Sequence, residues 1–215
     1  MSFSVGVGEA DFAVLRIENA YYVDKTEILY ELVHDTKNKV TLFTRPRRFG
    51  KTLMMSMMEN FFDIRKNNEA IFEGLAITEH RDFCTKWMNQ YPVLFVSFKD
   101  AESESFDVAY AKLMTTISDV CKSYSEICKS NAVDRDDLDV FARLKAQKGT
   151  ASDVQNSLKT LMRMMNAVYG KKVILLIDEY DVPLAKASEK NTVKNGYFFR
   201  NVGCYQGNYE YGSQR

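Results

Sequence analysis

The chain has 215 residues, 46% of them hydrophobic, and its 29 lysines and arginines balance its 29 aspartates and glutamates. One globular domain with a sizeable core is the expectation, and zero net charge excludes a global field that would draw the protein to nucleic acid or an anionic membrane. The sequence has no run of about 18 uncharged apolar residues, no export signal and no closely spaced cysteine pair among its four cysteines. These features predict a cytoplasmic protein that does not contact a membrane.

The first part of the chain predicts a helix, a strand and a second helix in that order. Apolar residues spaced for one helical face predict a short helix over residues 25–35. The β-branched and aromatic run Val40–Thr44, bounded by Lys37–Lys39 and Pro46, predicts a buried strand. Residues 51–64 are rich in Leu, Met and Phe without Pro or Gly, which predicts a helix with its methionines in the core.

Two further runs predict strands, Val93–Phe98 and Val173–Ile177. Both are continuously apolar, as in a parallel sheet that is covered on both faces. Helices are expected between them over residues 106–129 and 152–169, the second with Ser152 as N-cap and Gly170 as its end. Helices that alternate with parallel strands define an α/β fold.

The last 25 residues differ in composition from the rest of the chain. Tyr, Gly and Asn dominate residues 191–215, and no helix or strand period can be traced there. We therefore expect one partial domain over residues 1–190 followed by an irregular tail, in a chain whose native sequence is truncated or altered near Lys190.

The triplet Gly50-Lys51-Thr52 lies between the expected strand and helix, as in a phosphate-binding loop. Such a loop offers backbone N–H groups and a helix N-terminus to a polyphosphate, a lysine to its β- and γ-phosphates, and a hydroxyl to magnesium. Arg45 stands where the first glycine of the usual pattern would be, so the formal pattern fails. By chance alone the triplet occurs in roughly one chain in ten of this size.

A second motif, which is acidic, supports the interpretation of the first. The apolar run Ile174–Ile177 leads directly into Asp178 and Glu179, as a buried strand would to deliver carboxylates to the ligand-binding edge of a parallel sheet. Asp178 would hold Mg²⁺ and Glu179 would polarise an attacking water. The alternative is an ordinary polar strand end before a turn at Pro183.

Arg47 and Arg48 add positive charge beside the triplet. Guanidinium groups bind phosphate oxygens bidentately, although salt bridges to surface carboxylates explain these arginines equally well.

Three strings in this sequence resemble those of a known family. They are Tyr22–Thr26, the string Thr44–Thr52 that contains Arg-Pro-Arg-Arg-Phe-Gly-Lys-Thr, and Leu176–Asp181 followed by Pro183 and Leu184. The chain resembles the AAA-ATPase-like family of P-loop proteins from about Phe12 to Leu184, and in that family an arginine at the first glycine position is the rule.

The resemblance implies a P-loop fold, a parallel sheet flanked by helices and incomplete at its C-terminus, with ATP and Mg²⁺ as cofactors. The residues it places around the nucleotide phosphates are Arg47, Arg48, Phe49, Gly50, Lys51 and Thr52. Thr52 and Asp178 would bind the metal, and Lys51 and Glu179 would act in catalysis. Asp24 and Lys25 match a family motif of unassigned role, and members often carry a C-terminal nuclease-like domain.

Three functions remain open at this point. The first is Mg-dependent ATP hydrolysis that acts on a protein partner or on a missing C-terminal domain. The second is a module that binds nucleotide without turnover, which an incomplete sheet favours. The third, nucleic-acid binding, has only the family's attached domain in its favour, and no residue pattern separates ATP from GTP.

Overall fold

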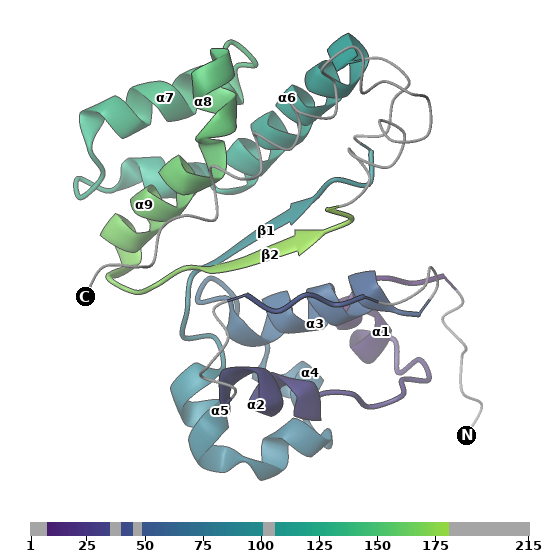
Figure 1. The fold of residues 1–215 in the computed structure, drawn as a ribbon. Helices are drawn as coiled ribbons and strands as arrows, with labels where there is room; N and C mark the ends of the chain where they lie inside the picture. Colours follow the sequence, from purple (N-terminus) through teal and green to yellow (C-terminus); the bar gives the residue numbers. More distant parts are fainter. Residues whose placement is uncertain (1–7, 35–39, 45–48, 101–105, 181–215) are drawn as a thin grey trace. The chain divides into compact units, whose positions relative to one another are not determined.

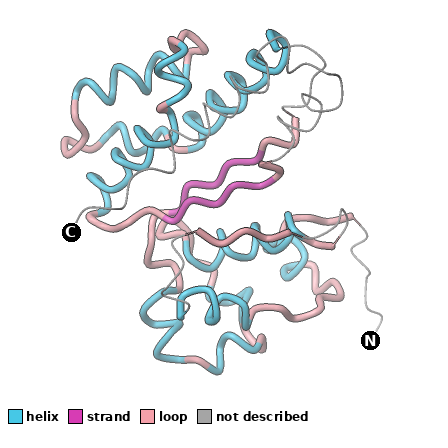
Figure 2. The backbone as a smooth tube through the Cα atoms, viewed as in Figure 1, coloured by secondary structure: helices cyan, strands magenta, loops and turns pink. Residues whose placement is uncertain are grey.

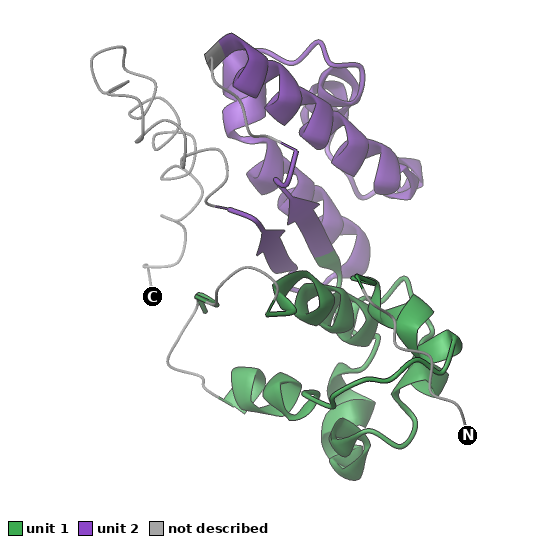
Figure 3. Ribbon diagram, turned by 90° about the vertical axis from the view of Figure 1, so that its right-hand side faces the viewer, with its two compact units in different colours: residues 1–93 green, residues 94–215 purple. Residues whose placement is uncertain are grey.

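The computed structural model describes residues 8–34, 40–44, 49–100 and 106–180 (Figure 1). The chain forms two compact units, residues 1–93 and 94–215, and each is described by itself (Figure 3). The described part of unit 1 is helical, and the two strands of the sheet belong to unit 2 except for Val93, with which the first strand begins.

Helix α3, Lys51–Phe62, is the central element of unit 1. Around it lie α1 (Phe12–Ile17), α2 (Glu27–His34), α4 (Glu69–Phe72), the 3-10 helix η1 (Ala76–Glu79) and α5 (Arg81–Trp87). The predicted helices over residues 25–35 and 51–64 are confirmed, each ending one or two residues inside its expected bounds. On α3, Met57 and Met58 are buried as predicted, while Met54 and Met55 are half-buried.

Aromatic rings connect α3 to the helices around it. The Phe61 ring lies edge-on to Phe72 of α4, with centroids 5.3 Å apart, and stacks with Phe83 of α5 at 5.8 Å. Phe72 in turn contacts Phe12 of α1 at 5.0 Å. Burying one such side chain contributes about 1.5–3 kcal/mol, so these contacts hold the short helices on the face of α3.

The strand predicted over Val40–Thr44 is absent, which corrects that expectation. The structure gives these residues no regular secondary structure (Figure 2), and Val40 and Leu42 are 64% and 60% exposed. A strand needs a neighbour to take up its N–H and C=O groups, and within the described ranges this segment has no ladder partner. The β-branched composition alone is not sufficient to make a strand.

Unit 2 contains a two-stranded parallel sheet and a group of helices. Its elements are β1 (Val93–Ser97), α6 (Phe106–Ser123), the 3-10 helix η2 (Ser125–Lys129), α7 (Arg135–Lys145), α8 (Ala151–Gln155), α9 (Ser157–Tyr169) and β2 (Ile174–Asp178). Both predicted strands are confirmed, and they pair side by side in the same direction (Figures 1 and 2). The Phe98 N–H donates to the Asp178 carbonyl oxygen at 3.0 Å, which aligns the two carboxyl ends. The predicted α/β fold is therefore correct.

The helices of unit 2 cover one face of this sheet (Figure 1). Leu94 and Val96 of β1 are buried against apolar side chains of α6, α7 and α9, among them Ile117, Leu144 and Leu161. One N–H on the outer edge of β1 also has a partner: the Phe95 N–H, which points away from β2, donates to the Tyr124 hydroxyl oxygen at 2.9 Å. No helix in the described ranges combines the length and apolarity that crossing a bilayer requires.

Local capping explains where the unit 2 helices begin and end. The Asp134 side chain caps α7, and Gly170 ends α9 in the left-handed conformation, as predicted. The expected N-cap Ser152 is wrong: Thr150 caps α8 in a reciprocal box with Asp153. The Asp153 carboxylate also binds Arg143 bidentately, at 2.9 and 3.0 Å. Helix α8 therefore starts where Asp153 can bond to both Thr150 and Arg143.

Thr150→Ala should lower the free energy of unfolding by about 1 kcal/mol, because the Asp153 N–H then loses its acceptor at the start of α8. Urea denaturation followed by circular dichroism measures this loss. Ser152→Ala is the matched control and should change stability by less than about 0.5 kcal/mol. Equal losses in the two variants would contradict the assignment of Thr150 as the cap.

Candidate functional site

The start of α3 is a left-handed turn at Gly50 that leads directly into the helix. Gly50 precedes the helix in the left-handed conformation, with φ 75°, and its side chain position is open, with nothing within 4 Å of an added Cβ. Its carbonyl accepts the Met54 N–H at 2.9 Å, so the helix is regular from its first turn. Lys51 and Thr52 follow directly and are half-buried. The first N–H groups of a helix have no acceptor within the helix and lie at its positive end, so this turn can accept an anion.

The other predicted phosphate residues are placed only in part. Phe49 is 58% exposed beside Gly50, while Arg47 and Arg48 lie outside the described residues.

The opposite end of α3 is closed by Asn89, which sequence reasoning did not single out. Its side-chain amide donates to the carbonyl oxygens of Asn60 and Asp63, each at 3.0 Å, and its backbone N–H donates to Phe61 at 2.6 Å. Asn89 has φ 54°, a left-handed conformation that Asn adopts more readily than most residues. The last carbonyls of α3, which a helix cannot satisfy itself, thus find donors in the segment that leads into β1.

A polar network extends this closure. Asn60 is almost fully buried, and its amide oxygen accepts from Asn68 at 2.5 Å and from Lys66 at 3.2 Å. Asp63, fully buried at the end of α3, pairs with Arg65 at 2.7 Å. Buried polar groups are stable only when they are hydrogen-bonded, so these residues fix the position of the C-terminal end of α3.

In unit 2, Asp178 and Glu179 lie at the carboxyl end of β2, as predicted from the apolar run before them. Asp178 is the last residue of β2 and is only 3% exposed. Glu179 follows with φ 53°, a backbone conformation that is uncommon for a residue with a side chain and that concentrates at functional sites. The half-buried Glu179 therefore leaves the sheet in a sharp turn.

The predicted site residues thus fall in two places. Gly50, Lys51 and Thr52 belong to unit 1, and Asp178 and Glu179 belong to unit 2. In each unit the local element expected for that motif is present, a helix start for the first and a strand end for the second.

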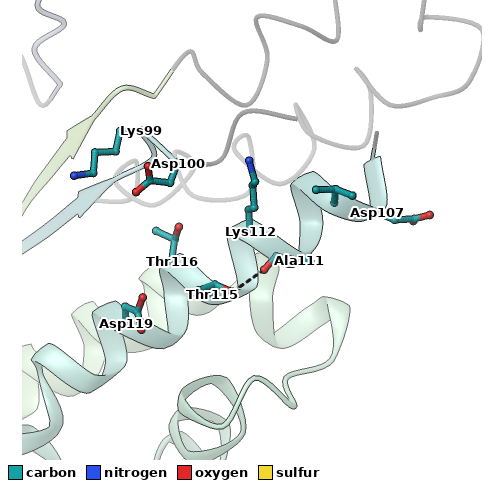
Figure 4. Close-up of a pocket in the computed structure, with 9 residues that line it drawn as sticks. Lys99, Asp100, Asp107, Ala111, Lys112, Thr115, Thr116 and Asp119 are labelled. Carbon is teal, nitrogen blue, oxygen red and sulfur yellow. Dashed lines mark hydrogen bonds between the residues drawn. The ribbon is translucent and has the colours of Figure 1, made fainter. Parts of the chain in front are cut away.

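A cleft in unit 2 lies elsewhere and involves none of these residues. It has a volume of about 720 Å³ and is lined by Lys99 and Asp100 after β1 and by α6 residues that include Lys112 and Thr116 (Figure 4). Its lining mixes two lysines with three aspartates. The cleft contains neither the Gly50-Lys51-Thr52 triplet nor Asp178 and Glu179.

Metal binding by protein groups alone has no candidate in the described ranges, where no three His, Cys, Asp or Glu side chains form a cluster. Mg²⁺ ordinarily binds through one or two protein oxygens together with substrate phosphates and water. A buried Asp178 carboxylate and a Thr52 hydroxyl are ligands of the type that such an ion takes.

A helix that begins directly after Gly50 and a parallel strand that ends at Asp178 are the local elements of a P-loop-like α/β fold. Residues 6–202 match a family model described as "Predicted AAA-ATPase", and the chain belongs to this AAA-ATPase-like family.

The chain is also similar to a curated protein. The chain is 26% identical over 182 residues to an uncharacterized protein in the vnfD 5' region of Azotobacter chroococcum. That alignment covers 83% of this chain and 29% of the relative, so the chain spans less than a third of the relative's length. No solved structure matches.

Gly50→Ala should lower the free energy of unfolding by about 1–2 kcal/mol, because a Cβ is strained in the left-handed conformation. Gly50→Asn should cost less, since Asn tolerates this conformation. Urea denaturation of the parent and both variants tests the ranking. A larger loss for Asn than for Ala would show that side-chain volume, and not backbone conformation, sets the requirement at this position.

Proposed function

We propose that this chain binds the phosphates of ATP at the start of α3 and, in the intact family fold, hydrolyses ATP with Mg²⁺. The observation that carries the proposal is the left-handed Gly50 directly before Lys51 and Thr52 at the N-terminus of a twelve-residue helix. Membership of a family described as predicted AAA-ATPases supports the same ligand.

Each residue of the proposed site has a role that its chemistry supports. Gly50 allows the turn to bring backbone N–H groups toward the phosphates, and Lys51 supplies a positive charge to the β- and γ-phosphates. We assign Phe49, Arg47 and Arg48 to the same phosphate-binding segment. A guanidinium fork matches a phosphate better than an ammonium does.

The metal would be held by the Thr52 hydroxyl and the Asp178 carboxylate, together with phosphate oxygens. Mg²⁺ would supply charge that stabilises the transferring phosphoryl group. Glu179 would act as the general base that polarises water, which suits a carboxylate next to a metal ligand and held in an uncommon backbone conformation.

Lys51→Ala should weaken Mg-ATP binding at least tenfold, because one charge-assisted contact to phosphate is worth about 1.5–3 kcal/mol. Isothermal titration calorimetry of the parent and the variant measures the change. Lys86→Ala, which removes an exposed lysine from α5 of the same unit, is the matched control and should bind as the parent does. A parent that binds no Mg-ATP would overturn the proposal.

A second candidate is a module that binds nucleotide without turnover. It is favoured by the two-stranded sheet and by the absence of a strand over Val40–Thr44 in the described part of the chain. In either case we propose that nucleotide binding or hydrolysis changes the state of a protein partner or an attached domain.

Glu179→Gln separates the two candidates. The enzyme reading expects ATP turnover to fall by about 10²–10⁴-fold, because an amide cannot take up a proton, with Mg-ATP affinity kept. Steady-state phosphate release and calorimetry measure the two quantities, and Glu31→Gln on the exposed face of α2 is the control. A parent with nucleotide affinity and no turnover would leave the binding module as the function.

A further inference from the structure

The segment Tyr22–Thr26 has no role in the proposed phosphate chemistry. Its side chains nevertheless accept hydrogen bonds from several backbone N–H groups. Asp24 Oδ1 accepts from the Thr26 N–H at 2.8 Å and from the Thr26 hydroxyl at 2.7 Å. These two bonds close a tight turn directly before α2, which begins at Glu27.

The same two side chains also hold the start of η1, about fifty residues away in the sequence. Asp24 Oδ2 accepts the Ala76 N–H at 2.7 Å, and the Thr26 hydroxyl oxygen accepts the Ile77 N–H at 3.1 Å. The N-cap residue of η1, Leu75, offers no side-chain cap of its own. Thr26 and Ile77 are fully buried, so the segment supplies acceptors for N–H groups that would otherwise be costly to bury.

Asp24 is ionised when it makes these bonds. Partial burial alone would raise the pKa of Asp24, but the N–H groups of Ala76 and Thr26, the Thr26 hydroxyl and the charge of Arg16 outweigh it and lower the pKa. Hydrogen bonds to an ionised acceptor are about twice as strong as neutral ones, so the segment is firmly anchored to η1.

The other end of the segment contacts α3. The Tyr22 hydroxyl donates to the Met57 sulfur at 3.2 Å, and the Tyr22 ring lies edge-on to Phe12 with centroids 5.3 Å apart. The Phe12 N–H donates to the Ser56 hydroxyl oxygen at 3.0 Å. Residues four apart share a helix face, so Ser56 lies one turn beyond Thr52 on the same side of α3.

We infer that Tyr22, Asp24 and Thr26 are positioning residues that fix the second turn of α3 and so hold the helix in the orientation needed to bind phosphate. Asp24 and Thr26 fix the segment to η1, and Tyr22 and Phe12 fix α3 to the segment. The inference rests on the proposed nucleotide site at Gly50–Thr52 and assigns a function to residues that do not touch the nucleotide.

Asp24→Asn tests the anchor with almost no change in shape. An amide has one oxygen, so it can keep the bonds to Thr26 or the bond to Ala76, but its NH₂ group then faces an N–H donor. Mg-ATP affinity, measured by calorimetry well below the melting temperature, should fall by roughly two- to thirtyfold, the range for residues that act through a packed neighbour. Asp82→Asn in the first turn of α5, an exposed carboxylate in the same unit, should leave affinity unchanged.

Tyr22→Phe tests the contact with α3 and keeps the ring. It should weaken Mg-ATP binding less than Asp24→Asn does, and Tyr21→Phe, at a 61% exposed neighbour, is the control. Hydrogen exchange of the backbone amides of residues 53–57 gives a readout without nucleotide, and exchange should be faster in both test variants than in both controls.

The outcomes separate this inference from the proposed function. If the parent binds no Mg-ATP but exchange at residues 53–57 rises in the test variants, the nucleotide proposal fails, and what stands is that the segment anchors α3. If Asp24→Asn and Tyr22→Phe bind Mg-ATP like the parent, or show parental exchange at these amides, then the segment only adds stability and the inference is overturned.

Discussion

The organisation of unit 1 depends on how the two ends of α3 are held, because the other helices of the unit lie around this helix. A helix leaves N–H groups unsatisfied at one end and carbonyl groups unsatisfied at the other. In this protein the carbonyl end is closed by Asn89 and the N–H end begins at a glycine without a side-chain cap. The two ends of α3 therefore differ: side-chain donors close the carbonyl end, and the electropositive N–H end follows a glycine that offers no side-chain cap.

In unit 2 the sheet is packed against helices, and β2 ends with Asp178 at the carboxyl edge of the sheet. The core of β1 and the unit 2 helices is apolar, and β2 pairs with β1 so that Phe98 and Asp178 lie side by side at the carboxyl ends. Gly170 stops α9 in the left-handed conformation just before the turn into β2. The backbone pairing of β2 with β1 and the end of α9 at Gly170 therefore place Asp178 at this edge of the sheet.

The sequence was informative wherever a short local pattern determines the structure. Continuous apolar runs predicted β1 and β2, and the Gly-Lys-Thr triplet predicted the start of α3, because strand composition and helix initiation are set by neighbouring residues. The strand predicted over Val40–Thr44 was wrong because a strand depends on a pairing partner, which local composition does not supply. The prediction of Ser152 as the N-cap was wrong because Thr150 bonds to Asp153. Asp153 is in turn held in place by Arg143, which lies in the preceding helix.

The residues that support the site were the least predictable. Asn89 reaches back to α3 across nearly thirty residues, and Asp24 reaches forward to Ala76 across more than fifty. Neither contact leaves a periodic signal, because each depends on a single polar side chain and on how distant segments pack. Only the family resemblance drew attention to Asp24, and it gave no reason for the residue.

The Tyr124 hydroxyl at the outer edge of β1 has a consequence for assembly. An exposed strand edge is a template on which other strands can add, and by accepting the Phe95 N–H this hydroxyl removes one of the hydrogen-bond donors that an incoming strand would need. At the β1 edge this donor is therefore already bonded within its own unit. A strand that added beside β1 would have to displace the Tyr124 hydroxyl or leave the Phe95 N–H out of its ladder.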